Sequence, residues 1–388
     1  MQSLKTSKPF AAWVTALLAV IVVGAYAAYL RLTVGFKVTA LSDYYPWGLW
    51  TGFDVLSGVA LASGAFTLAL VVYLLRVERF KPIIRPTILT GFLGYLMVVL
   101  GLIFDIAQPE RWWHPLYPPF WQPRSVLFEV YWCVFLYTIV LTIEFSPAFF
   151  ERLGWSSVLN ILRKITIPVV IAGIILSTLH QSSLGALYTI SPEHVHPLWY
   201  SPLLPVLFFT SAVAVAPAMI IFESTLSAKA TKRGLEHGLL KSLAKAAPAI
   251  LFVYLVMRFS DIAYGGASAY MLDGVRALFF WGEVGLGFIL PMILLAVPRV
   301  RESASSLFIA SLFIIGGVVA NRVNTVTTAW IGPEGVVYFP TWAEFAITFM
   351  ILAVGMLAFT LATKFLPVFP TREEARVKAA VPAAPRAG

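Results

Sequence analysis

The chain has very few histidines and cysteines: five histidines and one cysteine in 388 residues. A di-haem cytochrome b needs pairs of histidines inside its helices as axial ligands. Only His180 lies at the end of a predicted helix, while His114, His194, His196 and His237 fall in predicted loops. Cys133 alone cannot hold an iron–sulfur cluster, which takes about four thiolates, and it excludes an internal disulfide. If the chain takes part in electron transfer, a partner must bring the electrons.

Charged residues are also scarce, at 12% against 59% hydrophobic residues, and the mean hydropathy is +0.84. A soluble chain has roughly 25% charged residues, so the composition indicates a polytopic membrane protein. Apolar stretches long enough to cross a bilayer predict an all-α fold, with two four-helix bundles and two flanking helices. The ten predicted spans are 10–31, 48–75, 86–107, 125–149, 158–180, 203–227, 240–260, 275–297, 303–321 and 341–366.

The positive charges indicate how the chain is oriented. Of the 28 lysines and arginines, 21 fall in the termini and the loops on their side, and 7 fall in the opposite loops. The positive-inside rule therefore predicts that both termini are cytoplasmic, in a bacterial or archaeal cytoplasmic membrane. This distribution explains the net charge of +9 without a nucleic-acid partner. Residues 1–369 are predicted to form one integral membrane domain, and residues 370–388 a disordered cytoplasmic tail. The first span can also be interpreted as a signal peptide, although its apolar run is long for one.

Several acids lie within the predicted spans, where an ionisable group is costly and usually functional. Asp54, Glu129 and Glu283 lie inside their helices near the predicted outer face, and helix capping does not explain them. We therefore expect these three to line a polar cavity. Glu144 and Glu223 lie toward the cytoplasmic ends, where they either begin a proton path or pair with nearby basic residues.

Other ionisable groups lie at predicted helix ends, again near the outer face. Asp105 closes the third span and Glu344 opens the tenth, so both are expected to act as solvated caps. His180 closes the fifth span. Arg258 and Asp261 close the seventh, and their i,i+3 spacing also allows a simple local ion pair.

The outer loops are rich in proline and aromatic residues, at 108–123, 194–200 and 330–342. Tryptophan and tyrosine belts at the membrane interface account for such loops, but rigid aromatic loops also make a docking surface, and both interpretations remain open. Glu193, His194 and His196 suggest a metal site, but alternate residues in a loop without further ligands match zinc geometry poorly. We predict no metal in this chain.

Several sequence blocks together resemble one family. The stretch PWGLW at 46–50, running to Asp54, resembles the opening of the NrfD/PsrC family of membrane quinone-reactive subunits. Other blocks resemble the haem-free, hydrogenase-associated HybB-like branch. They are SVLFE at 125–129, EFSPA at 144–148, FERLGW at 150–155, HQSSLG at 180–185, VHPLW at 195–199, RF at 258–259 and YFPTW at 338–342.

The resemblance implies a subunit without haem, iron–sulfur cluster or metal, which binds quinone or menaquinone near the outer face. It implies a periplasmic ferredoxin-like iron–sulfur subunit as the electron donor. In the hydrogenase branch, the large and small subunits of a nickel–iron hydrogenase supply that subunit, and in other branches another periplasmic oxidoreductase does. Membrane lipids surround the chain.

Carried over by position, the resemblance implies a quinone site at Asp54, Glu129, His180, Arg258 and Asp261. The family often has Glu where this chain has Asp261, whose shorter side chain puts a direct contact with quinone in doubt. Gln181 and Trp50 belong to the same matching blocks and complete the predicted binding set.

We predict that His180 donates to a quinone oxygen and exchanges a proton with it, because histidine titrates in the right range. Gln181 would orient His180, and Asp54 would be a second donor or orient the histidine. Glu129 and Glu283 would relay protons, and a path from the cytoplasm would begin at Glu144 or Glu223. Polar residues such as Thr142 and Ser177 would extend this path through water.

Two other functions fit parts of the pattern. Ten spans with acids inside the membrane also suit a proton-coupled transporter, whose helices are often interrupted at matching positions of two repeats. The prolines Pro168, Pro217 and Pro291 are not paired in that way. A passive anchor for an enzyme at the outer face is the third interpretation, and it leaves Asp54, Glu129 and Glu283 unexplained.

Overall fold

The computed structural model describes residues 8–231 and 234–369. Within these residues the regular structure is helical, apart from a single bridge between Val195 and Trp330. Ten helices are long and apolar enough to cross a membrane, which confirms the predicted all-α membrane fold. They are Phe10–Val38, Trp50–Leu74, Glu78–Asp105, Val126–Leu153, Ser156–Thr189, Leu204–Thr231, His237–Tyr264, Gly274–Ala296, Ala304–Val326 and Trp342–Phe365.

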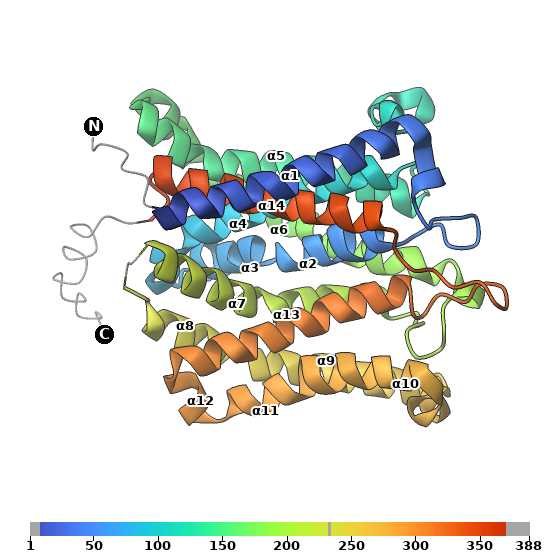
Figure 1. Ribbon diagram of the computed structural model, residues 1–388. Helices are drawn as coiled ribbons and strands as arrows, with labels where there is room; N and C mark the ends of the chain where they lie inside the picture. The colour runs from blue at the N-terminus through green and yellow to red at the C-terminus, as the bar shows by residue number, and fades with distance from the viewer. Residues whose placement is uncertain (1–7, 232–233, 370–388) are drawn as a thin grey trace.

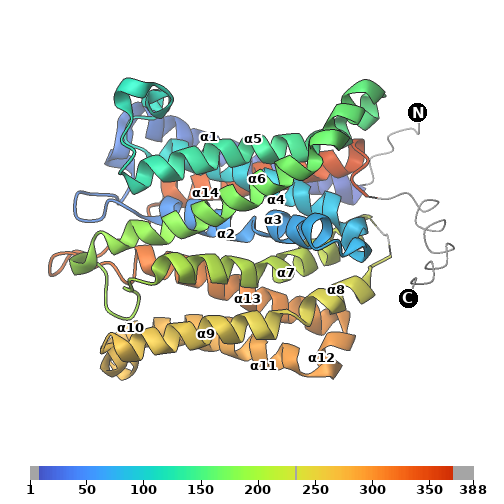
Figure 2. The same ribbon diagram turned by 180° about the vertical axis from the view of Figure 1, so that it is seen from behind.

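The helices form two bundles of four with two flanking helices (Figures 1 and 2). The first bundle contains the span built from η2 (Trp50–Ser57), α2 (Gly58–Leu61), α3 (Gly64–Ala69) and η3 (Leu70–Leu74), with α4 (Lys81–Asp105), α5 (Val126–Leu153) and α6 (Ser156–Thr189). The second contains α7 (Leu204–Thr231), α8 (His237–Ala244) with α9 (Ala247–Tyr264), α10 (Gly274–Trp281) with η10 (Gly282–Ile289) and α11 (Leu290–Ala296), and α13 (Ala304–Val326). The flanking helices α1 (Lys8–Val34) and α14 (Trp342–Phe365) pack together along α4.

Helix α1 begins and α14 ends at the same end of the molecule, here called the terminal end (Figure 1). The opposite end, here called the loop end, carries residues 39–49, 106–125, 190–203, 265–273 and 327–341. That the terminal end faces the cytoplasm stays a prediction, and the predicted tail at 370–388 lies outside the described residues.

Three of the seven basic residues that the charge count assigned to the opposite loops lie inside helices instead. Arg31, Arg258 and Arg322 are each no more than 2% exposed. The predicted span ends were too early, because polar residues continue these helices beyond the apolar runs. His180 does not close its helix, since α6 continues to Thr189, and His237 is the first residue of α8 rather than part of a loop.

Two spans contain π-helical segments: η2 and η3 lie in the span Trp50–Leu74, and η10 lies in the span Gly274–Ala296. Pro291 follows η10 and has no N–H to donate, so the ordinary i→i−4 pattern is interrupted just before it. Within η10, Gly287 meets Gly317 of α13: a Cβ built on Gly287 would lie 2.2 Å from the Gly317 Cα. The two backbones therefore touch there, and the helices separate toward the loop end.

Glu344, at the start of α14, is fully buried and joins three segments of the loop end. Its carboxylate accepts hydrogen bonds from the backbone N–H groups of Ala40 and Thr341, both at 2.9 Å, and from the Tyr338 hydroxyl at 2.5 Å. Burial, followed by the bond to Glu344, raises the pKa of Tyr338 well above its usual value. Glu344 caps α14 through a capping box with Thr341, but the expectation that this cap is solvated was wrong.

We expect Glu344→Ala to lower the thermal stability of the purified protein clearly. The substitution leaves the buried Tyr338 hydroxyl and two partly buried backbone N–H groups without an acceptor, at up to about 1–3 kcal/mol each. Differential scanning fluorimetry in detergent measures the effect, with Glu334→Ala as the matched control because Glu334 is exposed on the same loop. Equal melting temperatures for the two variants would contradict this role of Glu344.

Candidate functional site

A polar face of α6 lies at the centre of the first bundle. Ser177, His180 and Gln181 are spaced so that they share one side of the helix, and each is at most 1% exposed. Tyr95 of α4 and Tyr137 of α5 face them: the Tyr95 ring lies 5.8 Å from the His180 ring and 4.6 Å from the Tyr137 ring, both edge to face. The result is a compact polar group, here called the His180 cluster, surrounded by apolar helices.

Most polar atoms of the His180 cluster have no hydrogen-bond partner. These are both ring nitrogens of His180, the hydroxyls of Tyr95, Tyr137 and Ser177, and the Gln181 Oε1. Buried polar groups in proteins are nearly always bonded, and leaving one unpaired costs about 1–3 kcal/mol. So many unpaired groups in one place indicate a position for water or for a polar ligand.

The structure does not bring His180, Gln181 and Asp54 together as predicted. The Gln181 Nε2 donates to the Val59 carbonyl at 2.9 Å, so Gln181 fixes α6 against α2 instead of orienting the histidine. The Asp54 carboxylate accepts from the Thr348 hydroxyl at 2.6 Å and packs at Gly101 of α4. Asp54 therefore joins η2 to α14 and does not hold the His180 ring.

Trp50 and Asp105 also have structural partners. The Trp50 Nε1 donates to the Glu344 carbonyl at 3.3 Å, and the side chain is 1% exposed. The Asp105 carboxylate accepts from the Thr51 hydroxyl at 2.9 Å, so it ties α4 to η2 rather than capping its helix in solvent. Trp50 thus helps to anchor the start of η2.

Glu129 was predicted to lie deep in a polar cavity, and this was wrong. It lies in the first turn of α5 with an exposed side chain. Its Oε1 accepts from the Ser183 hydroxyl at 2.7 Å, and Ser183 is one helical turn from His180 on α6. Glu129 therefore links the membrane-facing surface near the loop end to the helix that carries His180.

Arg258 and Asp261 lie in α9 of the second bundle, away from the His180 cluster. Arg258 donates to the Leu198 carbonyl at 2.5 Å, and Asp261 accepts from the Ser201 hydroxyl at 2.8 Å. Among the described ion pairs they do not pair with each other, so the simple i,i+3 interpretation was wrong. Both hold the 198–201 segment at the loop end.

Glu283, in η10, is the centre of a second buried polar group. Its carboxylate accepts from the Asn321 amide at 2.7 Å, the Trp199 indole N–H at 2.8 Å and the Asn324 amide at 3.0 Å. Arg322 donates to the Asn321 Oδ1 at 2.5 Å. Sequence reasoning missed these partners because it ended the ninth span at residue 321, although NRVN at 321–324 was a visible polar signal.

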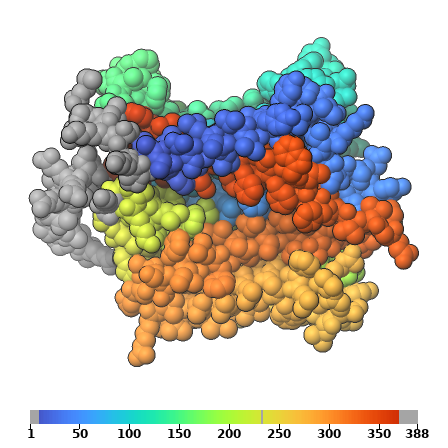
Figure 3. Space-filling model, in the orientation of Figure 1, coloured from blue at the N-terminus to red at the C-terminus, as the bar shows by residue number. Residues whose placement is uncertain are grey.

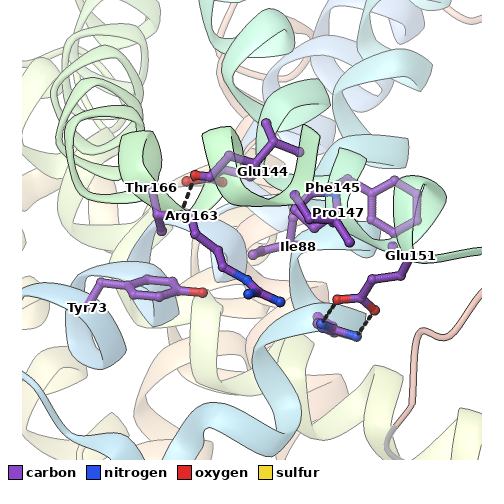
Figure 4. A pocket seen from close by; sticks show the side chains of 12 residues that line it. Tyr73, Ile88, Glu144, Phe145, Pro147, Glu151, Arg163 and Thr166 are labelled. Carbon is purple, nitrogen blue, oxygen red and sulfur yellow. Dashed lines mark hydrogen bonds and ion pairs between the residues drawn. The ribbon is translucent and has the colours of Figure 1, made fainter. Parts of the chain in front are cut away.

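Glu144 lines a cavity of about 180 Å³ near the terminal end of the first bundle. Figure 4 shows the side chains of Tyr73, Glu144, Arg163 and Thr166 around this space, with Glu151 and its ion pair to Arg85 at one side. Glu223 lies elsewhere, in α7 beside α3 and α4. Of the two acids predicted to begin a proton path, Glu144 is the one that lies near Tyr137 of the His180 cluster.

Gly173 of α6 lies between this cavity and the His180 cluster, one turn before Ser177. A Cβ built on Gly173 would lie 3.0 Å from Val140, 3.3 Å from the Tyr137 ring and 3.8 Å from the Glu144 Oε1. The Tyr137 ring and the Glu144 carboxylate therefore both lie beside Gly173, where the helix carries no side chain. Thr142, which the sequence suggested for the same path, is exposed and donates to the Thr138 carbonyl.

The loop end presents aromatic residues on an ordered backbone. The 108–123 loop contains three 3₁₀ turns, and its Trp112, Trp113, Tyr117, Phe120 and Trp121 are exposed. Two other loops are joined by hydrogen bonds from the Ile331 N–H to the His194 carbonyl and from the His196 N–H to the Ala329 carbonyl, both 2.7 Å. Such a surface suits both interpretations, interface belt and docking platform.

His194 and His196 have structural partners at the loop end. The His194 ring stacks on Trp330 at 5.3 Å, and the His196 Nδ1 accepts from the Leu198 N–H at 3.3 Å. Burial, and next the charge of Arg276, lower the pKa of His196. The neutral form is therefore favoured in the folded loop, and its contribution to stability falls as the pH drops through the lowered pKa.

The described residues contain no group of three or more histidine, cysteine, aspartate or glutamate side chains that could hold a metal ion. A bis-histidine haem does not fit either. Within the membrane interior the chain offers the single histidine His180, and the other four are at loops or at the first residue of α8.

The comparison with known proteins agrees with this architecture. The model of the family described as polysulphide reductase, NrfD, matches residues 37–332. The chain belongs to the NrfD family. The match covers both bundles, including His180 and Glu283, and the loop-end segments up to residue 332. The flanking helices α1 and α14 lie outside it.

Three relatives of this NrfD-family chain extend over most of its length. A protein of Nitratidesulfovibrio vulgaris is 37% identical over 90% of this chain and 92% of its own. The probable Ni/Fe-hydrogenase 2 b-type cytochrome subunit of Escherichia coli K12 is 33% identical over 88% of each chain. The menaquinone reductase integral membrane subunit of Nitratidesulfovibrio vulgaris is 32% identical over 90% of each chain. The second name describes a b-type cytochrome, but the present chain has only His180 in the membrane interior and therefore no pair of histidines there to bind a haem.

Proposed function

We propose that this chain is the quinone-reactive membrane subunit of a respiratory oxidoreductase complex, and that the quinone head group reacts at the His180 cluster. The observation that carries the proposal is the set of unpaired buried polar atoms around His180. A quinone ring has two carbonyl oxygens that need donors, and the hydroxyls of Tyr95 and Tyr137 and the imidazole of His180 are buried donors with no acceptor outside the His180 cluster. The names of two relatives, a hydrogenase subunit and a menaquinone reductase subunit, support the same function.

Electrons reach this site from a partner, since the chain supplies too few histidines and cysteines for haem or cluster. The exposed aromatic loops of the loop end are the surface on which we place a ferredoxin-like iron–sulfur subunit. Aromatic residues are enriched at interfaces because they bury a large area at low entropic cost. A nickel–iron hydrogenase is the donor that the hydrogenase relative favours, with the loop end periplasmic and the terminal end cytoplasmic.

Quinone reduction also takes two protons, and we propose that they come from the terminal end. The path begins in the cavity at Glu144, passes Gly173, and continues over Tyr137, Ser177 and Tyr95 to His180. Each step lies on one face of α6 or on the side chains that face it. Water molecules bonded to the unpaired hydroxyls would connect these groups. Electrons from one side and protons from the other make the reaction electrogenic.

Binding alone tests the location of the quinone. A short-chain naphthoquinone is titrated into the purified protein in nanodiscs, and quenching of the intrinsic fluorescence reports occupancy. We expect Tyr95→Phe to weaken binding by about tenfold, the effect of one buried hydrogen bond, because the substitution removes only a hydroxyl. Tyr73→Phe is the matched control in the cavity at the terminal end. Equal affinities for Tyr95→Phe, His180→Ala and wild type would contradict the site.

A further inference from the structure

The second bundle has a groove that the function proposed above does not use. It has a volume of about 690 Å³ and lies between α10–η10 and α13, which are side by side in Figure 3. Its walls are apolar, and its lining includes Gly282 and Gly316, where a built Cβ would meet nothing within 4 Å. The contact between Gly287 and Gly317 closes the groove toward the terminal end. The outer walls, including Val275 and Leu278, are exposed on the membrane-facing surface.

The groove is polar at one place, where Glu283 and Asn324 line it. Glu283 accepts three hydrogen bonds from the protein, and a carboxylate has about four acceptor positions. The Asn324 amide donates one N–H to Glu283, and its carbonyl oxygen accepts from the Thr328 hydroxyl. One acceptor position of Glu283 and the second N–H of the Asn324 amide remain for a ligand, so the groove suits a head group with a hydroxyl, which both donates and accepts.

The depth of Glu283 restricts the ligand further. It lies nine residues into the span that begins at Gly274, or about 13 Å along a helix that rises 1.5 Å per residue. A phospholipid head group stays at the interface, and an acyl chain that reached this depth has no donor. A small ring with hydroxyl groups on an isoprenoid tail can place both parts, with the ring at Glu283 and the tail along the apolar walls.

The two bundles show a related arrangement, which is independent of the groove's shape. In the first bundle, Glu129 lies on the bundle's third helix, α5, and accepts from Ser183 on its fourth helix, α6. In the second bundle, Glu283 lies on the third membrane span of that bundle, in η10, and accepts from Asn321 and Asn324 on the fourth, α13. His180 lies nine residues from the loop-end terminus of α6, and Glu283 lies nine residues from the loop-end terminus of the span Gly274–Ala296. The second bundle thus carries an acceptor at the depth where the first carries its reactive histidine.

We propose that this groove is a second quinone-pool site, which binds the reduced form, a quinol, with a ring hydroxyl on Glu283. The ligand class rests on the proposed function, whereas the groove and its acceptor do not. A quinol fits because it donates where quinone only accepts. The site holds product or substrate of the same pool at the membrane surface, apart from the His180 cluster.

Photolabelling tests the site without turnover. The probe is a naphthoquinol with a diazirine beside the ring, equilibrated with the protein in nanodiscs of phosphatidylethanolamine and phosphatidylglycerol, and labelled peptides are mapped by mass spectrometry. Gly316→Phe places a large side chain in the groove at a position where a built Cβ meets nothing within 4 Å, and Leu312→Phe, one turn away on the same helix and outside the lining, is its control. Glu283→Gln keeps the shape of the side chain and weakens the acceptor.

We expect labelling of α10 and α13 that excess unlabelled quinol removes and that the oxidised probe shows several-fold less. Gly316→Phe should lose it, Leu312→Phe should keep it, and Glu283→Gln should reduce it by about tenfold. No labelling in the wild type would overturn the proposal. Equal labelling by an acyl-chain diazirine, without competition by quinol, would assign the groove to ordinary lipid. If the wild-type complex does not reduce quinone but its groove is still labelled, the proposed function is refuted and the groove site is retained.

Discussion

His180→Ala is expected to lower donor-driven quinone reduction by about a hundredfold or more, the range contributed by a positioned proton donor. The substitution removes the one titratable side chain whose ring nitrogens are both buried and unpaired in the first bundle. Assembly should be unaffected, because His180 makes no hydrogen bond that holds two helices together. The measurement is quinone reduction by the purified complex, with its subunit composition checked by size exclusion and gel electrophoresis.

Ser182→Ala is the control for this variant. Ser182 belongs to the same sequence block but is only half-buried and lies on another side of α6. We expect it to retain nearly full activity. An assembled His180→Ala complex that reduces quinone at the wild-type rate would exclude His180 as the proton donor, and it would favour a passive anchor over a quinone-reactive subunit.

Gly173→Val is expected to stop proton uptake from the terminal end and to slow quinone reduction by about tenfold or more. A side chain at this position meets Tyr137 and Val140 and fills the gap beside the Glu144 carboxylate. Glu144→Gln should give the same loss of proton uptake by removing the exchangeable group without adding volume. Proton uptake is followed with a pH dye inside proteoliposomes whose terminal ends face the lumen.

Thr142→Val provides the comparison, because Thr142 faces outward and its hydroxyl bonds to its own helix. It should leave both proton uptake and turnover unchanged. If Gly173→Val and Glu144→Gln still take up protons from the lumen at the wild-type rate, the path along α6 does not exist, and the protons for quinone come from the loop end.

The sequence predicted the spans well because the signal for a membrane helix is strong: twenty apolar residues in succession. The helix ends were less predictable, since the helices continue through polar residues that are buried by neighbouring helices. Arg322 and His180 illustrate this, as each follows an apolar run and reads as a boundary, while tertiary packing keeps both inside.

The candidate site was predicted only in part, for a related reason. Sequence identifies which polar residues lie in the membrane but not which of them meet. Tyr95 and Tyr137 give no signal in an aromatic-rich chain, although they face His180. Arg258 and Asp261 match the family blocks but lie in the other bundle, where they hold a loop. Glu283 was predicted to line a polar cavity with Asp54 and Glu129, and only the structure supplies its three donors.

The most direct test of the account measures quinone reduction and proton uptake together in proteoliposomes that hold the wild-type complex. Electrons are supplied outside through the donor enzyme, and a pH dye is trapped in a lumen that faces the terminal ends. The account predicts that the lumen becomes alkaline in step with quinone reduction and that a membrane potential forms. Quinone reduction without alkalinisation of the lumen would contradict proton supply through Glu144, and no quinone reduction at all would contradict the proposed function itself.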